Sequence, residues 1–407
     1  MTGRVIAGRR PVFGPDLAVA GYRPVVAWSG AAGPGDQPGV LTGEMAGRHA
    51  GRRGWERLCG SKQVFVAPSR RFVAGHESLA LPPHRTVLVA DAAGASDPEA
   101  VEGYQRLAGE GYLLAVDGLD LFAADSPVLG LASFVFIDFL GLPSFGLRGL
   151  MELARSAGTR PVAVGVDDAA HMTLARHAGF ELFEGHLLSR PLSAKPDALN
   201  PGRFTILRMI EAVNDPGTSA TDLQKLVEAD AGLSYRLLHV SSLGAAGGLR
   251  RPVRSVREAT VLLGRERLYR WLVLMLVADA NQGAPEQIGI AMSRARMAEL
   301  VAVAGGAAPA DAAFTVGLVS ALELVLCAPL PDIVAKLAIT NDLVQAVLGR
   351  RGPLGGILDD VLAWEAGDPP DRPRSGVDHL DLERLYVDAV GWAEDLIDIL
   401  GDADRAA

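Results

Sequence analysis

The sequence predicts two fold classes in one chain, an α/β region followed by an all-α region. From about Pro11 to Leu192, short apolar segments alternate with helical segments that close on glycine. After the polar stretch 193–203, the apolar residues follow the spacing of helices instead. The chain has 407 residues, a length that suits two or three domains. We therefore expect one domain over residues 1–195 and a second over residues 196–407.

The first region is expected to form a (β/α) barrel. Its candidate strands are 17–27, 64–67, 86–90, 112–117, 134–139, 161–166 and 179–188, and its candidate helices are 99–111, 147–158 and 169–179. Repeated strand–helix–strand units place successive strands parallel to one another. Their number favours a closed barrel over an open sheet. The segment 30–39, which is rich in glycine and proline, is expected to be a loop or insertion.

The second region is expected to contain helices only. Asn200 and Pro201 suit an N-cap and a first helical turn. Residues 255–258 form a capping box for a helix that ends at Gly264. Further helices are expected at 267–280, 314–328, 331–339, 341–350 and 382–400.

Composition limits the classes of function. The chain is 49% hydrophobic and 21% charged, which is typical of a globular protein. The net charge of −9 gives no general attraction to nucleic acid or to anionic membranes. The two cysteines, Cys59 and Cys327, do not form a disulfide framework. The first residues lack an apolar leader, and the apolar run 271–278 is too short to span a bilayer. We expect a cytoplasmic protein without a membrane partner.

Asp117 stands at the end of a candidate strand, in the stretch LLAVDGLD. Barrel enzymes place catalytic groups and metal ligands at the carboxyl ends of their strands. Asp138 ends the next candidate strand but one residue. Whether Asp117 is a working ligand depends on the residues at the neighbouring strand ends.

Those strand ends carry a family resemblance. The first region resembles an EAL domain, the barrel that hydrolyses the bacterial messenger cyclic di-GMP. The second resembles an HDOD domain, a helical module related to HD phosphohydrolases that usually lacks their catalytic residues. The HDOD resemblance is carried by VEADAGLSYRLLHVSS (227–242), RSVREATVLLGRERLYRWLVL (254–274), FTVGLVSALELVL (314–326) and VLAWEAGD (361–368). The resemblance covers nearly the whole chain and implies an EAL barrel followed by an HDOD domain.

The resemblance implies a divalent-cation site built from strand-end carboxylates, because phosphodiester hydrolysis needs cations that activate water. In this chain most of the implied positions are changed. The ligand glutamate of the Glu-Ala-Leu segment is Arg23, and the phosphate-binding arginine that follows is Ala27. The ligand asparagine of the next strand is Ala67, and the next ligand glutamate falls near Val89.

The later strands keep a few acidic residues. The paired aspartates of the family match Asp117 and Gly118. The lysine of Lys-Ile-Asp is Phe136, with Asp138 retained, and the next glutamate is Val164, with Asp167 three residues on. The family glutamine is Glu184. We interpret the acidic set as vestigial site positions, namely Asp117, Asp138, Asp167 and Glu184, and we expect no catalytic residue, no metal and no cofactor.

The resulting hypothesis is a non-enzymatic signalling protein, an inactive EAL scaffold joined to an HDOD protein-interaction module. Another signalling protein is the expected partner, cyclic di-GMP binding is not expected, and self-association is left open. Two alternatives stay open: a divergent cyclic di-GMP phosphodiesterase, or a receptor that binds cyclic di-GMP without hydrolysing it. The barrel mouth would discriminate, because it either collects carboxylates or is plugged by Arg23, Phe136 and Val164.

Four arginines of the second region form a basic cluster, Arg250, Arg251, Arg254 and Arg257. A solvated helix face is the ordinary interpretation, and a docking patch for an acidic partner is the alternative. A nucleic-acid role is not favoured, because aromatic residues are missing between the arginines. His171 and His177 are six residues apart, which is not the spacing of a helical metal pair.

Overall fold

The computed structural model describes most of the first region and the C-terminal third of the chain. The described residues are 3–29, 40–42, 45–47, 54–79, 81–92, 97–119, 127–192, 209, 212–213, 218–228, 268, 285–326, 328–335 and 339–405. Several predictions from the sequence fall outside them. These are the loop 30–39, the caps at 200–201 and 255–264, the helix 267–280 and the four-arginine cluster.

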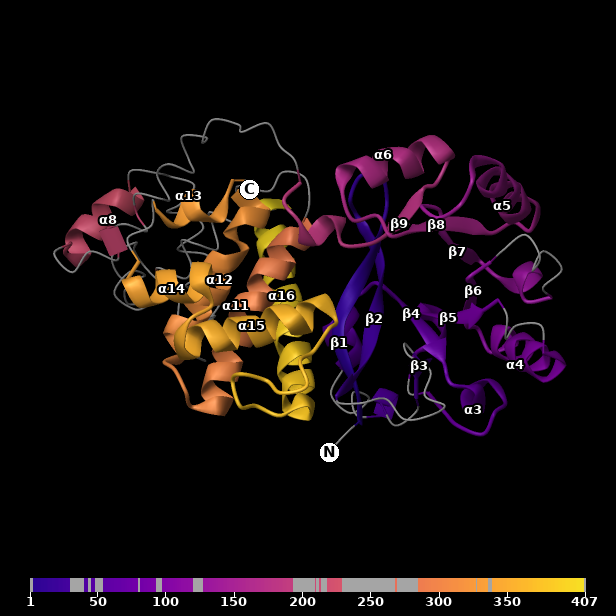
Figure 1. Ribbon diagram of the computed structural model, residues 1–407, viewed down its shortest axis with the longest axis horizontal. Helices are drawn as coiled ribbons and strands as arrows, with labels where there is room; N and C mark the ends of the chain where they lie inside the picture. The colour runs from indigo at the N-terminus through magenta and orange to yellow at the C-terminus, as the bar shows by residue number, and fades with distance from the viewer. Residues whose placement is uncertain are drawn as a thin grey trace. The chain divides into compact units, whose positions relative to one another are not determined.

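The first region forms a barrel of strands with helices outside it (Figure 1). Its strands are β1 (Gly3–Phe13), β2 (Val19–Ser29), β3 (Val40–Leu41), β4 (Gln63–Pro68), β5 (Thr86–Asp91), β6 (Leu113–Asp117), β7 (Phe134–Asp138), β8 (Arg160–Val164) and β9 (Leu182–Glu184). Its helices are α2 (Gly54–Cys59), α3 (Arg70–Val73), α4 (Pro98–Gly109), α5 (Ser144–Ser156) and α6 (Ala169–Ala178), with short 3-10 turns η1 (Pro83–Arg85), η3 (Leu129–Leu131) and η4 (Leu187–Ser189). The predicted (β/α) barrel is present.

The barrel is parallel except at its first strand. Strands β4 to β9 pair in parallel, and a parallel pair between β2 and β4 closes the ring. Strand β1, which the sequence analysis did not predict, runs antiparallel to both β2 and β9. The reversal arises because only a short turn separates β1 from β2, and such turns join antiparallel strands. In this turn the amide of Leu17 donates to the carbonyl of Gly14.

The inside of the barrel is a packed apolar core. It contains Val12, Phe65, Val87, Val89, Ala115, Phe134, Phe136, Val162 and Leu182. The Phe65 ring meets the rings of Phe134 and Phe136 edge-on, with centroids 5.4 and 5.6 Å apart. Alternate residues of each strand point inward, as the two-residue period of a strand requires. The neighbouring residues face the helices, so the strands are apolar on both faces.

The described part of the second region is helical. Its helices are α8 (Ala220–Glu228), α11 (Pro285–Gly305), α12 (Ala310–Leu326), α13 (Leu330–Val334), α14 (Asn341–Gly349), α15 (Gly352–Ala366) and α16 (His379–Arg405). The helices expected at 314–328, 341–350 and 382–400 are therefore confirmed, and the one expected at 331–339 is shorter. Helices α11 and α12 approach closely at Gly317, where a Cβ atom would lie 2.8 Å from the Cα atom of Ala295.

The chain divides into two compact units that are not continuous in sequence. The first unit comprises residues 1–192 and 360–391, and the second comprises residues 193–359 and 392–407. Within the first unit, the indole Nε1 of Trp364 donates a hydrogen bond of 3.2 Å to the carbonyl of Ile6, and the Ile6 amide donates one of 2.9 Å to Glu383 Oε1. Two domains that divide near residue 195 remain a prediction about folding, while the compact barrel unit includes a C-terminal segment.

Among the described residues, none of the helices combines the length and the apolar character that a membrane crossing would need.

Candidate functional site

Three strand ends bring Arg23, Asp117 and Glu184 together at the barrel mouth. They belong to β2, β6 and β9, respectively. The Arg23 guanidinium lies 2.6 Å from Asp117 Oδ2 through Nη2 and 3.3 Å from Glu184 Oε2 through Nη1. Its carbon also lies 5.1 Å from the centre of the Phe136 ring. One arginine therefore bridges two of the acidic positions that the sequence singled out. We call these three residues the Arg23 cluster.

The Arg23 cluster is held in a largely buried setting. The Glu184 side chain is only 1% exposed, and Arg10 approaches its other oxygen at 3.8 Å. Burial lowers the pKa of Arg23, but the charges of Glu184 and Asp117 outweigh burial and raise the pKa overall. Arg23 is thus a permanent cation, placed where the family resemblance implies a ligand to a cation.

The other two acidic positions lie apart from the Arg23 cluster. Asp138 is exposed at the end of β7 and makes no side-chain hydrogen bond or ion pair with the described residues. Asp167 Oδ1 accepts a hydrogen bond of 2.8 Å from the His186 amide and lies 3.1 Å from His186 Nδ1. Desolvation raises the pKa of Asp167, but the hydrogen bonds from His186 more than offset it and hold the pKa below its usual value. The histidine was not predicted, because it lies 19 residues from Asp167.

The donor set at the mouth does not fit a hydrated divalent cation. Asp117 and Glu184 are both occupied by Arg23. Within the described part of the chain, no three His, Cys, Asp or Glu side chains are close enough to hold a metal ion. Phe136 is fully buried, and Val164 packs against the barrel core. Of the two arrangements that the sequence left open, the mouth has the plugged one.

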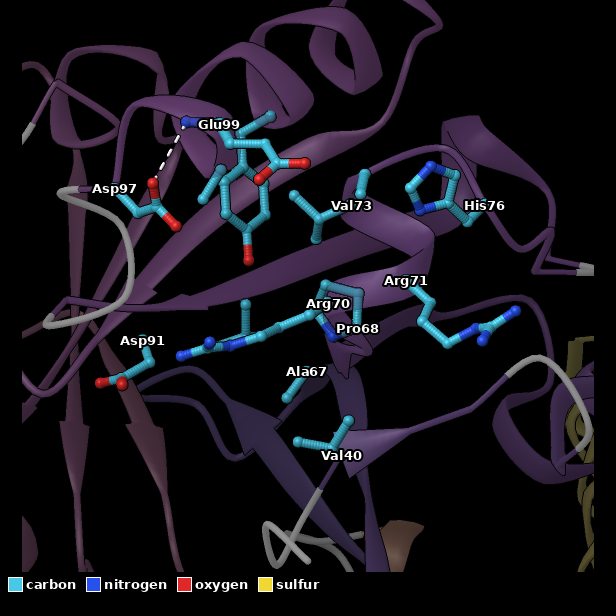
Figure 2. A pocket seen from close by; sticks show the side chains of 14 residues that line it. Val40, Ala67, Pro68, Arg70, Arg71, Val73, His76, Asp91, Asp97 and Glu99 are labelled. Carbon is cyan, nitrogen blue, oxygen red and sulfur yellow. Dashed lines mark hydrogen bonds between the residues drawn. The ribbon is translucent and has the colours of Figure 1, made fainter. Parts of the chain in front are cut away.

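A cavity of about 460 Å³ lies beside the Arg23 cluster, at the ends of β4 and β5 (Figure 2). Its floor includes Val40, Ala67 and Val89, and charged side chains from α3 and α4 surround it. Sequence reasoning identified Ala67 and Val89 only as lost ligands. It missed the charged residues, although Arg70 and Arg71 directly follow Ser69, which caps α3 by accepting from the Phe72 amide.

A comparison with protein families identifies the second region. Residues 203–343 match the model described as the HDOD domain. The chain contains an HDOD domain. This HDOD match confirms the predicted second half, although much of it lies outside the described residues. The barrel that precedes the HDOD domain is EAL-like in the order of its motifs.

Curated relatives cover most of the chain. It is 27% identical over 306 residues to the cyclic di-GMP phosphodiesterase CdgJ of Vibrio cholerae, which covers 72% of this chain and 70% of that protein. It is 23% identical over 421 residues to the uncharacterized protein YuxH of Bacillus subtilis, covering 97% and 99% of the two chains. The HDOD protein described here is thus related to a protein named for cyclic di-GMP.

Solved structures similar to the barrel carry the EAL name. The EAL domain of Mycobacterium smegmatis DcpA is 21% identical, with a TM-score of 0.36, and covers 47% of this chain and 93% of its own. The EAL domain of FimX from Pseudomonas aeruginosa, bound to cyclic di-GMP, is 17% identical, with a TM-score of 0.34, and covers 47% and 91%.

One expectation about partners is wrong. The sequence analysis did not expect cyclic di-GMP as a ligand, because the phosphate-binding arginine is replaced by Ala27. A relative is named a cyclic di-GMP phosphodiesterase, and similar EAL structures are described as bound to cyclic di-GMP. The error has a physical reason. The loss of one cation was weighed at a single position, while Arg10 and Arg23 place other cations at the mouth.

Proposed function

We propose that this HDOD protein is a cyclic di-GMP-related regulatory protein whose barrel takes the dinucleotide as a ligand and does not hydrolyse it. The helical HDOD half would then be the module through which the protein acts. The single observation that supports the absence of hydrolysis is the bridge from Arg23 to Asp117 and Glu184. The relation to CdgJ supports cyclic di-GMP as the ligand.

The Arg23 bridge opposes a metal ion by simple electrostatics. At an effective dielectric constant of about 20, a unit charge about 4 Å from a dication repels it by roughly 8 kcal/mol, twice the value for two unit charges. Solvent at the partly exposed Asp117 reduces this repulsion. A dication would also have to replace Arg23 at both carboxylates, and Glu184 is buried. Without a bound dication, the barrel lacks the means to activate water that hydrolysis needs.

The second candidate function is a divergent cyclic di-GMP phosphodiesterase. The name of CdgJ favours it, although the identity is 27%. Such an enzyme would need a metal site that does not use the family positions, since Ala67, Val89 and Val164 have no ligand atoms.

A hydrolysis assay separates the two candidates. The full chain is incubated with cyclic di-GMP and either Mg²⁺ or Mn²⁺, and the products are resolved by chromatography. We expect the dinucleotide to remain intact, as in a heat-inactivated sample. Calorimetry with EDTA present tests binding without a metal, and we expect heat of binding for cyclic di-GMP. Linear product that disappears in Asp117→Ala but persists in the exposed control Asp138→Ala would establish the phosphodiesterase instead.

A further inference from the structure

The cavity between α3 and α4 has a segregated lining. Asp91, Asp97 and Glu99 lie along one side of it, and Arg71 and His76 lie along the other (Figure 2). Arg70 reaches across toward Asp91. Neither arginine forms an ion pair with another described residue, so both guanidinium groups can receive a ligand.

Charge balance at this cavity disfavours a simple ion. Three carboxylates face two guanidinium groups, so a small anion meets net repulsion and a small cation meets two arginines. A dipolar molecule, with an anionic group at one end and N–H donors at the other, satisfies both sides at once. Carboxylates accept hydrogen bonds only, and arginines donate only, so the two ends of such a ligand have a defined orientation.

The floor of the cavity is apolar and holds a buried tyrosine. Val40, Ala67 and Val89 provide surface for a flat ring, and Tyr104 is only 7% exposed. Burial and the charge of Asp91 raise the pKa of Tyr104 to about 12, so its hydroxyl stays protonated at neutral pH. That hydroxyl makes no hydrogen bond to the described part of the chain, and it is available as a donor or acceptor. The volume of about 460 Å³ is in the range of small-molecule pockets.

We propose that this cavity binds a guanine nucleotide without a metal ion, with the phosphate at Arg71 and His76 and the base edge at Asp97 and Glu99. Guanine fits the acidic side because its adjacent ring and amino N–H groups can both donate to one carboxylate. Arginine binds phosphate through paired hydrogen bonds. The nucleotide is either a free guanosine monophosphate or one half of a cyclic dinucleotide. The inference concerns a cavity outside the Arg23 cluster and does not rest on the absence of hydrolysis.

Calorimetry on the full chain in EDTA tests the proposal, with guanosine 5′-monophosphate as the probe. We expect inorganic phosphate and guanosine alone to bind about tenfold more weakly or worse, because each satisfies one side of the cavity. Arg71→Ala and Glu99→Gln should each weaken the nucleotide about tenfold. The matched controls are Arg148→Ala and Glu152→Gln, two exposed positions on α5, and they should bind as the unchanged chain does. Tyr104→Phe keeps the buried ring and tests the hydroxyl.

The outcomes separate the two nucleotide sources. If Arg71→Ala weakens both the monophosphate and cyclic di-GMP, one half of the dinucleotide occupies the cavity. If it weakens the monophosphate alone, the free nucleotide is the ligand. The proposal is overturned if the folded chain gives no heat with guanosine monophosphate, if Arg71→Ala binds it unchanged, or if binding requires Mg²⁺. Any hydrolysis of cyclic di-GMP would leave these results unaffected, because binding is measured with the metals removed.

Discussion

At the scale of single residues, the barrel mouth shows which part of a site a sequence can predict. The replacement of a ligand glutamate by Arg23 could be read from the motif at residues 23–27. Its pairing with Glu184 could not, because 161 residues separate the two and neither has a local signal for the other. The pair of Asp167 and His186 was missed for the same reason. Their contacts depend on which strand ends become neighbours, and strand order is a property of the closed barrel.

Arg23→Ala should destabilise the barrel by about 3 kcal/mol, because it leaves a buried Glu184 and Asp117 without their shared cation. Urea denaturation followed by circular dichroism measures the loss. Arg384→Ala is the control, since Arg384 pairs with Asp381 on an exposed helix face and such pairs contribute about 1 kcal/mol or less. Equal losses for the two variants would mean that the Arg23 cluster has no special structural weight.

At the scale of elements, local signals located most helices and missed the first strand. Helices α4, α5 and α6 were found from apolar spacing and from glycines near their ends. Strand β1 was missed because its sequence is basic and interrupted by Gly8, whose φ is +79°. A side chain at Gly8 would also meet the carbonyl oxygen of Glu365 at 2.8 Å. The irregular strand is thus fitted to a chain segment that no local pattern reveals.

Two glycines of α4 should respond in opposite ways to the same substitution. At Gly103 a Cβ atom would lie 2.7 Å from Val73 Cγ1, so Gly103→Ala should lower the free energy of unfolding by about 1–3 kcal/mol. At Gly109 no atom lies within 4 Å of an added Cβ, so Gly109→Ala should cause no loss and raise stability by up to about 1 kcal/mol. Thermal unfolding of both variants checks the pair, and a stabilised Gly103→Ala would refute the close packing of α3 on α4.

At the scale of the whole molecule, the division into units differs from the division that composition suggests. The change from strands to helices near residue 195 is visible in the sequence. The return of residues 360–391 to the barrel unit is not, because those residues are helical like the segments around them. The tie is specific, since both backbone groups of Ile6 are bonded to side chains of that segment.

Trp364→Ala in the full chain should therefore weaken the barrel, by about 3–5 kcal/mol, because Trp364 is fully buried and bonds to Ile6. Hydrogen exchange of the peptide covering β1 should become faster. Leu380→Ala, at a position 44% exposed in the same segment, should leave that exchange unchanged. A fragment of residues 1–195 that protects β1 as well as the full chain does would contradict this dependence.

The bonds of Ile6 also have a consequence for the order of events during synthesis. Ile6 is among the first residues to leave the ribosome, and its partners Trp364 and Glu383 follow 358 and 377 residues later. At about 5–20 residues per second, this delay is roughly 20–70 seconds. For that time the amide and carbonyl of Ile6 have only water or a chaperone to bind. The nascent barrel strand is then exposed to mispairing, and the barrel becomes complete only when translation is nearly finished.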